Sequence, residues 1–312
     1  MKLNKIVTIS AITLLFMASC SNWKDSEIPS PEVSANSPAA RFASTNPASF
    51  EIPPSNDMSF TLTVIRDSEA KANALDVPIT IISDSAFTVP STVSFAAGSA
   101  TATLQIKIDP TATPGSTLPL AISLDNADAN PYKAEYSSYY GKILISPWVS
   151  MGTAQFYDDF IFAEWADEPV PYVAEVSIDK NFLDPNSFRI SYPYTDDILK
   201  AVGDDDGSMG GTTQANIVFT INGDNVTWSK FWYTSLLYDG DGTDIKAYLP
   251  SAINKDGDSK SVVVRDADGN IEYFELYPYY YIDGLGGFGL FPVYLGFPGF
   301  DLSGELGVPI FQ

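Results

Sequence analysis

The sequence predicts an all-β protein that consists of a β-sandwich followed by a second, aromatic-rich β-domain. From about residue 49, apolar and polar residues alternate with a period of two, which is typical of half-buried strands. The alternating runs are short and are separated by Gly, Pro, Asp and Ser, with no long helical pattern between them. Aromatic residues make up 13% of the chain and concentrate in its second half, so we expect two domains of different character.

Residues 1–19 have the features of a secretory signal peptide. Lys2 and Lys5 precede an apolar run, residues 6–17, that is too short to cross a bilayer of about 30 Å as a helix. The following Met-Ala-Ser-Cys resembles the lipobox of bacterial lipoproteins, in which the mature chain begins at an acylated cysteine. The resemblance implies that Cys20, the only cysteine, carries lipid such as diacylglycerol and palmitate. An ordinary signal peptide with an incidental cysteine is the alternative.

Residues 20–48 predict a flexible tether behind the lipidated cysteine, because they are rich in Ser, Pro, Ala and Asn. The acidic residues Asp25 and Glu27 resemble the surface-export signal of Bacteroidetes-type lipoproteins. That resemblance implies a protein anchored in the outer membrane and facing the cell exterior. A periplasm-facing anchor is the alternative.

Composition excludes several classes of function. The chain has 39 acidic and 17 basic residues, a net charge of −22, so we expect neither nucleic acid nor anionic lipid as a ligand. It has no histidine, and its single cysteine is assigned to the anchor. Catalytic triads, thiolate chemistry and histidine metal sites are therefore excluded, while Ser-Lys and carboxylate-pair catalysis stay open.

Residues 49–146 predict the β-sandwich. In "SFTLTVIR" and "TATLQIKI" every second residue is apolar, and further short strands follow the same pattern in "VPITII", "TVSF", "PLAISL" and "GKILI". These runs, and above all residues 93–98 with their terminal Gly turn, resemble a Calx-beta or related immunoglobulin-like module. Calcium-binding members of that family carry acidic clusters after the alternating strand. Here "DPTATPGST" occupies that place, so no calcium site is carried over.

Residues 147–312 predict the aromatic-rich β-domain. Its candidate strands are "GTAQFYDDF", "YVAEVSIDK", "FRISYPY", "NIVFTIN" and the two halves of "SVVVRDADGNIEYFELY". Asp268-Gly269 predicts a type I′ hairpin turn, with positive φ at both residues. One short helix is expected from Asp196 to Ala201, capped by Thr195 and ended by Gly203.

The start of this second half resembles a module of Bacteroidetes-type outer-membrane lipoproteins of uncharacterised function. In that module a Gly-Thr-aromatic-acidic strand precedes a strand that ends in an Arg-aromatic-Pro-Tyr corner. The matching residues here are Gly152, Thr153, Tyr157, Asp158, Asp159, Arg189, Pro193 and Tyr194. The resemblance implies location and fold, and no catalytic residue is transferred from it.

Acidic turns are candidate calcium sites. Asp and Asn oxygens at every second position suit Ca²⁺, which takes six to eight oxygen ligands. Among the turns "GDDDGS", "YDGDGTD" and "NKDGDS", the favoured set is Asp239, Asp241 and Asp244. None completes an EF-hand loop, and solvated Asp-Gly turns are the alternative. No other cofactor is expected.

Aromatic runs give the candidate ligand site. Flat rings stack on the apolar faces of sugars while neighbouring polar groups, here Asp239, Asp241 and Asp283, bind hydroxyls. The selected residues are Trp228, Trp232, Tyr233, Tyr277, Tyr279 and Tyr280. Large rings of this kind also fill protein cores, which is the alternative.

The leading hypothesis is therefore a non-enzymatic, surface-exposed binding protein, with glycan as the ligand class. An adhesin or assembly component that binds protein, as part of a surface complex, is the first alternative. A hydrolase using carboxylate pairs such as Asp158 with Asp159, or Glu164 with Glu175, is the second. The Gly- and Pro-broken apolar tail after residue 284 is expected to close the second domain as buried strand and turn rather than to form an exposed patch.

Overall fold

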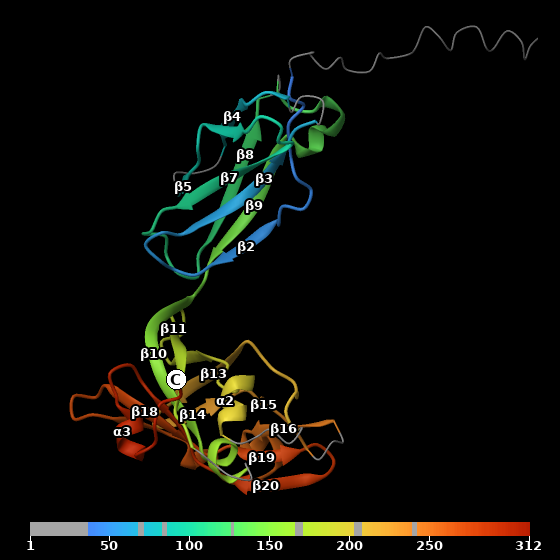
Figure 1. The fold of residues 1–312 in the computed structure, drawn as a ribbon. Helices are drawn as coiled ribbons and strands as arrows, with labels where there is room; N and C mark the ends of the chain where they lie inside the picture. Colours follow the sequence, from blue (N-terminus) through green and yellow to red (C-terminus); the bar gives the residue numbers. More distant parts are fainter. Residues whose placement is uncertain are drawn as a thin grey trace, which may run out of the picture. The chain divides into compact units, whose positions relative to one another are not determined.

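The computed structural model describes residues 37–67, 72–82, 86–125, 128–165, 171–202, 208–238 and 242–312. Within these ranges the chain is almost entirely β, as predicted (Figure 1). It divides into two compact units. The first holds the described residues up to Ala48 with Phe60–Ile106 and Leu120–Gly141, and the second holds Ser49–Ser59, Lys107–Pro119 and Lys142–Gln312. The boundary expected near residue 147 stays a prediction.

In the described part of the chain before residue 146, nine strands form two sheets. The four-stranded sheet has the order β1 (Arg41–Phe42), β3 (Ser59–Ile65), β7 (Thr101–Ile108) and β5 (Phe87–Thr88). The five-stranded sheet has the order β2 (Ser49–Ile52), β9 (Ser138–Ile145), β8 (Thr117–Leu124), β4 (Leu75–Ile81) and β6 (Thr92–Phe95). A short 3-10 helix at Pro131–Tyr136 precedes β9.

Burial in these strands follows the alternation of the sequence. Along β7, every second residue from Ala102 to Ile108 is buried and the residues between them are exposed. β1 lies within residues 20–48, which were expected to form a flexible tether. That expectation is wrong for the last part of this range. Phe42 is buried there and pairs with Val64, so ordered structure begins before residue 49.

The second half contains a closed barrel of eight antiparallel strands. In barrel order these are β10 (Trp148–Asp158), β11 (Ala174–Asn181), β12 (Ser187–Ser191), β13 (Asn216–Asn222), β14 (Asn225–Trp228), β17 (Val262–Arg265), β18 (Ile271–Leu276) and β21 (Val293–Gly296). β21 pairs with both β10 and β18 and so closes the barrel. Val293, Leu295 and the nearby Phe297 are buried, although Leu285 and Phe288 of the same tail are exposed.

A separate four-stranded antiparallel sheet accompanies the barrel. Its order is β15 (Phe231–Tyr238), β16 (Thr243–Tyr248), β19 (Tyr279–Ile282) and β20 (Gly286–Leu290). Buried residues of this sheet, including Trp232, Ile245 and Tyr280, belong to one hydrophobic cluster with the barrel residues. The sheet therefore has one face in the core and one face directed away from it.

The helical elements are short. α2 (Asp196–Ala201) has the predicted bounds, and the Thr195 hydroxyl accepts a hydrogen bond from the backbone N–H of Ile198, while Gly203 lies outside the described residues. The described residues after 146 also form α3 (Leu302–Leu306), a π-helical turn at Phe160–Glu164 and 3-10 turns at Pro250–Ile253 and Asp258–Lys260. Among the described residues, no helix has the length and apolar character needed to cross a membrane.

The hairpin between β17 and β18 differs from the predicted type I′ turn. Only Gly269 has positive φ there, at 87°, and Asp268 does not. The Asp266 carboxylate accepts hydrogen bonds from the backbone N–H groups of Asp268 and Asn270, at 2.9 and 2.8 Å. These bonds hold a wider turn, and the register shifts by one residue at Arg265.

Candidate functional site: the outer face of an aromatic sheet

The outer face of the four-stranded sheet carries two rows of side chains. Strand pairing places Phe231, Tyr248 and Tyr279 side by side in one row, and Tyr233, Lys246 and Tyr281 in the next. Since alternate residues of a strand point to opposite faces, both rows share the face away from the core. We call the rings of Phe231, Tyr233, Tyr248, Tyr279 and Tyr281 the ring face.

The five rings form a continuous chain of contacts. Their centroids are separated by 5.2 Å between Tyr233 and Phe231, and by 5.0 Å between Phe231 and Tyr248. The chain continues to Tyr281 at 5.8 Å and then to Tyr279 at 6.5 Å. Four of the rings are half-buried, whereas Tyr248, on the central strand β16, is buried. The accessible rings therefore come from β15 and β19, with Lys246 of β16 between Tyr233 and Tyr281.

A polar group lies within this surface. The Asp283 carboxylate accepts hydrogen bonds from the Lys246 ammonium at 2.7 Å and from the Tyr248 hydroxyl at 2.6 Å. These donors, with Lys246 contributing most, hold the pKa of Asp283 below its ordinary value. Burial first and the bond to Asp283 second raise the pKa of Tyr248, so its hydroxyl stays protonated at neutral pH.

Lysines and a glycine complete the ring face. The Lys246 ammonium lies 4.9 Å from the ring centroid of Phe231, and those of Lys230 and Lys255 lie 5.7 and 5.4 Å from Tyr248 and Tyr279. Gly287 of β20 stands opposite Tyr281. A Cβ at this position would collide with the Tyr279 ring, so its absence makes room for the rings.

The structure divides the six predicted aromatic residues. Tyr233 and Tyr279 are on the ring face, and Tyr277 is half-buried on the connection between β18 and β19, where its hydroxyl donates to Glu275. Trp228, Trp232 and Tyr280 are instead core residues, 7%, 1% and 0% exposed. For these three, the expected exposed platform is wrong. Trp232 and Tyr280 alternate with ring-face residues and therefore point inward.

Three ring-face residues were outside the predicted set: Phe231, Tyr248 and Tyr281. Phe231 and Tyr281 lie in the same aromatic runs as the predicted residues Tyr233 and Tyr279. Tyr248 closes the segment "DIKAY", which has the alternation of a strand. Counting every second residue from Tyr233 and Tyr279 would have found Phe231 and Tyr281.

Behind the ring face lies a buried hydrogen-bond network centred on Asp158. The hydroxyls of Tyr194 and Tyr280 each donate to its Oδ2 at 2.6 Å, and the backbone N–H of Ile161 donates to Oδ1 at 3.1 Å. The Trp232 indole donates to the Tyr194 hydroxyl at 2.9 Å. Burial raises the pKa of Asp158 to about 6. Because Asp158 is fully buried, it is removed from the candidate hydrolase residues.

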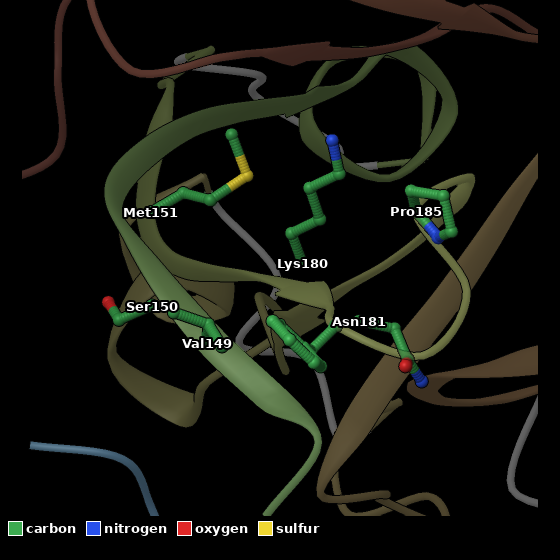
Figure 2. A pocket seen from close by; sticks show the side chains of 7 residues that line it. Val149, Ser150, Met151, Lys180, Asn181 and Pro185 are labelled. Carbon is green, nitrogen blue, oxygen red and sulfur yellow. The ribbon is translucent and has the colours of Figure 1, made fainter. Parts of the chain in front are cut away.

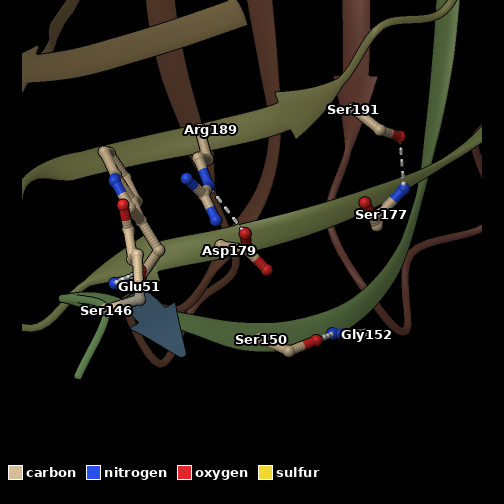
Figure 3. A network of polar contacts seen from close by, with 9 residues as sticks. Glu51, Ser146, Ser150, Gly152, Ser177, Asp179, Arg189 and Ser191 are labelled. Carbon is tan, nitrogen blue, oxygen red and sulfur yellow. Dashed lines mark hydrogen bonds and ion pairs between the residues drawn. The ribbon is translucent and has the colours of Figure 1, made fainter. Parts of the chain in front are cut away.

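Several residues that match the module of Bacteroidetes-type lipoproteins make local structural contacts. The Arg189 guanidinium donates to Asp179 at 2.7 Å (Figure 3). The same guanidinium lies 4.8 Å from the centroid of the Trp148 ring. Gly152 has a φ of 110° at a register shift in β10. Tyr157 donates to Asp159 at 3.3 Å. These contacts shape β10 to β12 of the barrel.

The predicted calcium set is only partly visible, because Asp239 and Asp241 lie outside the described residues. Both carboxylate oxygens of Asp244 accept hydrogen bonds from Thr212, one from its backbone N–H at 2.7 Å and one from its hydroxyl at 2.8 Å. Within the described ranges, no group of three or more acidic or sulfur side chains is placed to hold a metal ion. Calcium binding at this turn stays a prediction.

Two neighbouring cavities lie on the barrel, away from the ring face. One, of about 350 Å³, is mostly apolar and lies between β10, β11 and the loop that follows. Figure 2 shows the side chains of Met151 and Lys180 extending from adjacent strands in the same direction. The same two residues also line the second cavity, of about 460 Å³, so the two hollows adjoin.

No protein-family model and no curated protein matches the chain. Solved structures with some likeness include a multidomain protein with a DUF1735 domain from Bacteroides ovatus. It is 11% identical, with 82% of this chain and 90% of that chain covered and a TM-score of 0.27. An auxiliary nutrient binding protein from Bacteroides thetaiotaomicron is 12% identical, with coverages of 80% and 88% and a TM-score of 0.29.

A third match is CBD12 from CALX1.2, with 15% identity, coverage of 49% of this chain and 79% of that chain, and a TM-score of 0.26. At such identities and TM-scores, the matches assign neither a ligand nor a residue role to this chain.

Proposed function

We propose that this chain is a binding protein displayed on the outer membrane through an acylated Cys20, and that its ring face binds glycan. The observation that carries the proposal is the unbroken contact of five rings across three strands. Aromatic side chains combine a flat apolar surface with, in tyrosine, a polar hydroxyl at the edge. Such a surface matches sugars, whose rings have apolar faces and hydroxyl-bearing edges.

The polar groups of the ring face support this ligand class. Ligand sites are mostly apolar and aromatic, with a few fixed polar groups that orient the ligand. Asp283, Lys246 and Tyr248 form such a group, and their mutual hydrogen bonds fix their positions. Asp283 is exposed, so its carboxylate oxygens can accept further hydrogen bonds from sugar hydroxyls.

The test is retention of the soluble chain, residues 21–312, in gels that contain neutral or acidic polysaccharides. Tyr279→Ala and Tyr281→Ala remove half-buried rings from the ring face. Each should weaken retention by roughly 1–3 kcal/mol, the scale of a hot-spot truncation. Tyr140→Ala is the matched control, because Tyr140 is an exposed strand tyrosine in the first half of the chain, 68% exposed. Equal retention of all three variants by every polysaccharide would contradict the proposal.

A further inference from the structure

The charged residues that line the second barrel cavity are basic, although the chain as a whole is acidic. Lys180 of β11 and Arg265 at the end of β17 both line it, and no Asp or Glu does. The chain as a whole has 39 acidic and 17 basic residues. Two cations without a lining carboxylate, in so acidic a protein, make this groove locally attractive to anions.

Both cations are available to a ligand. Arg41, Lys107, Arg189 and Lys246 form ion pairs, whereas within the described ranges neither Lys180 nor Arg265 has a carboxylate close enough for one. The Lys180 ammonium lies 5.5 Å from the Phe188 ring centroid. Arg265 donates one N–H to the carbonyl of Gly269 at 3.0 Å. That bond orients the guanidinium and leaves its other N–H groups to a ligand.

The acidic residues next to the two cations in the chain, Asp179 and Asp266, have other partners. Asp179, next to Lys180, pairs with Arg189. Asp266, next to Arg265, accepts from two backbone N–H groups of its turn and from the Asn270 side-chain amide at 2.9 Å. Asn270 also lines the groove, and this bond leaves its amide oxygen as an acceptor.

The remaining lining is apolar and includes Met151, Ile271 and Pro298. The groove, about 460 Å³, falls in the size range of small-ligand sites, roughly 300–1,000 Å³. It therefore combines an apolar wall, two cations and one acceptor oxygen. These are the complements of an apolar sugar edge, a carboxylate and a hydroxyl.

We infer that this groove is a second binding site, separate from the ring face, for a carboxylate-bearing sugar unit. The carboxylate lies between Lys180 and Arg265, a hydroxyl donates to the Asn270 amide oxygen, and the apolar edge of the sugar packs against Met151 and Ile271. Charge-assisted bonds from two cations make the carboxylate the main determinant of affinity.

Calorimetric titration of the soluble chain with trigalacturonic acid tests the inference. Its methyl ester and galactotriose have similar size without the free carboxylates, and octanoate and inorganic phosphate test other sources of an anion. We expect trigalacturonic acid to bind tightest, with an affinity that falls as salt is added. Equal or tighter binding of the ester, galactotriose, octanoate or phosphate would overturn the inference.

Variants locate the site. Lys180→Gln and Arg265→Gln should each weaken trigalacturonic acid binding roughly tenfold or more, as expected for loss of a charge-assisted bond. Lys142→Gln, which removes an exposed lysine of β9, is the matched control and should bind like the unchanged chain. Tyr279→Ala, on the ring face, should weaken this binding less than either groove variant, because the Tyr279 ring has no charge to offer the carboxylate. If Tyr279→Ala abolishes it while the groove variants do not, acid recognition belongs to the ring face and the groove assignment is wrong.

Discussion

The carboxylate of Asp158 accepts a 2.6 Å hydrogen bond from the hydroxyl of Tyr280, which follows it by 122 residues in the chain. Asp158 ends the barrel strand β10, and Tyr280 lies in the middle of β19. The neighbours of Tyr280 on both sides, Tyr279 and Tyr281, belong to the ring face. A single buried carboxylate therefore ties the barrel to the back of the proposed glycan surface.

The first prediction concerns the pH dependence that this carboxylate imposes. Burial raises the pKa of Asp158 from 3.8 to about 6, so between these values the folded chain holds a proton that the unfolded chain has lost. The stabilising contribution of protonated Asp158 is therefore fully present below about pH 4 and is lost as the pH rises through about 6. This loss lowers the free energy of unfolding by about 3 kcal/mol. Asp158→Asn should remove this dependence.

The measurement is urea unfolding of both proteins from pH 4 to pH 7. The difference in unfolding free energy between them isolates Asp158, because most other carboxylates titrate equally in both. Asp159 is the nearest exception, since its charge interacts with Asp158 and helps to raise the pKa of that carboxyl. A difference that stays constant across this range would show that Asp158 does not titrate there.

The second prediction compares the core face and the outer face of the sheet formed by β15, β16, β19 and β20. Trp232 is 1% exposed, packs 5.1 Å from the Trp228 ring and donates to Tyr194. Trp232→Ala should lower the unfolding free energy by about 3–5 kcal/mol, the usual cost of deleting a buried aromatic side chain. Tyr281→Ala, on the half-buried outer face, should cost clearly less. Similar decreases in melting temperature for the two variants would refute this assignment of a core face and an outer face to the sheet.

Sequence periodicity identified the buried face of a strand when apolar and polar residues alternate. It was less informative for strands that carry aromatic residues on both faces. "TATLQIKI" alternates apolar and polar residues, and β7 has that burial. "FWYTSLLY" begins with three consecutive rings, so the pattern does not say whether Trp232 or its neighbours face the core. Only the pairing of β15 with β16, and of β16 with β19, settles which side is buried. This is why Trp232 was placed in the site and Tyr248 was not.

Local chemistry predicted the short helix better than the turn. At α2, Thr195 caps the helix and two acidic residues occupy its first turn, so side chain and backbone favour one structure. At the β17–β18 hairpin, the Asp268-Gly269 dipeptide favours type I′. The Asp266 side chain competes successfully, because it accepts bonds from Asp268 and Asn270 at once. A dipeptide pattern does not include that third residue.

The third prediction concerns the anchor, and it rests on the sequence because Cys20 lies outside the described residues. Cys20→Ala should abolish acylation, since the variant lacks the thiol that would carry lipid. The protein should then leave the membrane fraction, because stable anchoring depends on its acyl chains. Labelling with a fatty-acid probe, followed by membrane fractionation, measures both effects. Equal labelling of the variant and the unchanged chain would exclude the lipoprotein assignment.

The last prediction concerns the first half of the chain as an independent domain. Residues 37–146 should unfold cooperatively when expressed alone, because their two sheets bury side chains such as Leu62, Ile106 and Ile143. Residues 49–146 are the matched comparison, since they lack β1. Loss of β1 exposes surface that Phe42, 2% exposed, otherwise covers. A buried phenylalanine contributes about 3–5 kcal/mol, so the shorter fragment should melt at a lower temperature. Equal melting would show that β1 adds nothing to the sandwich. Failure of the longer fragment to unfold cooperatively would show that the two halves depend on one another for folding.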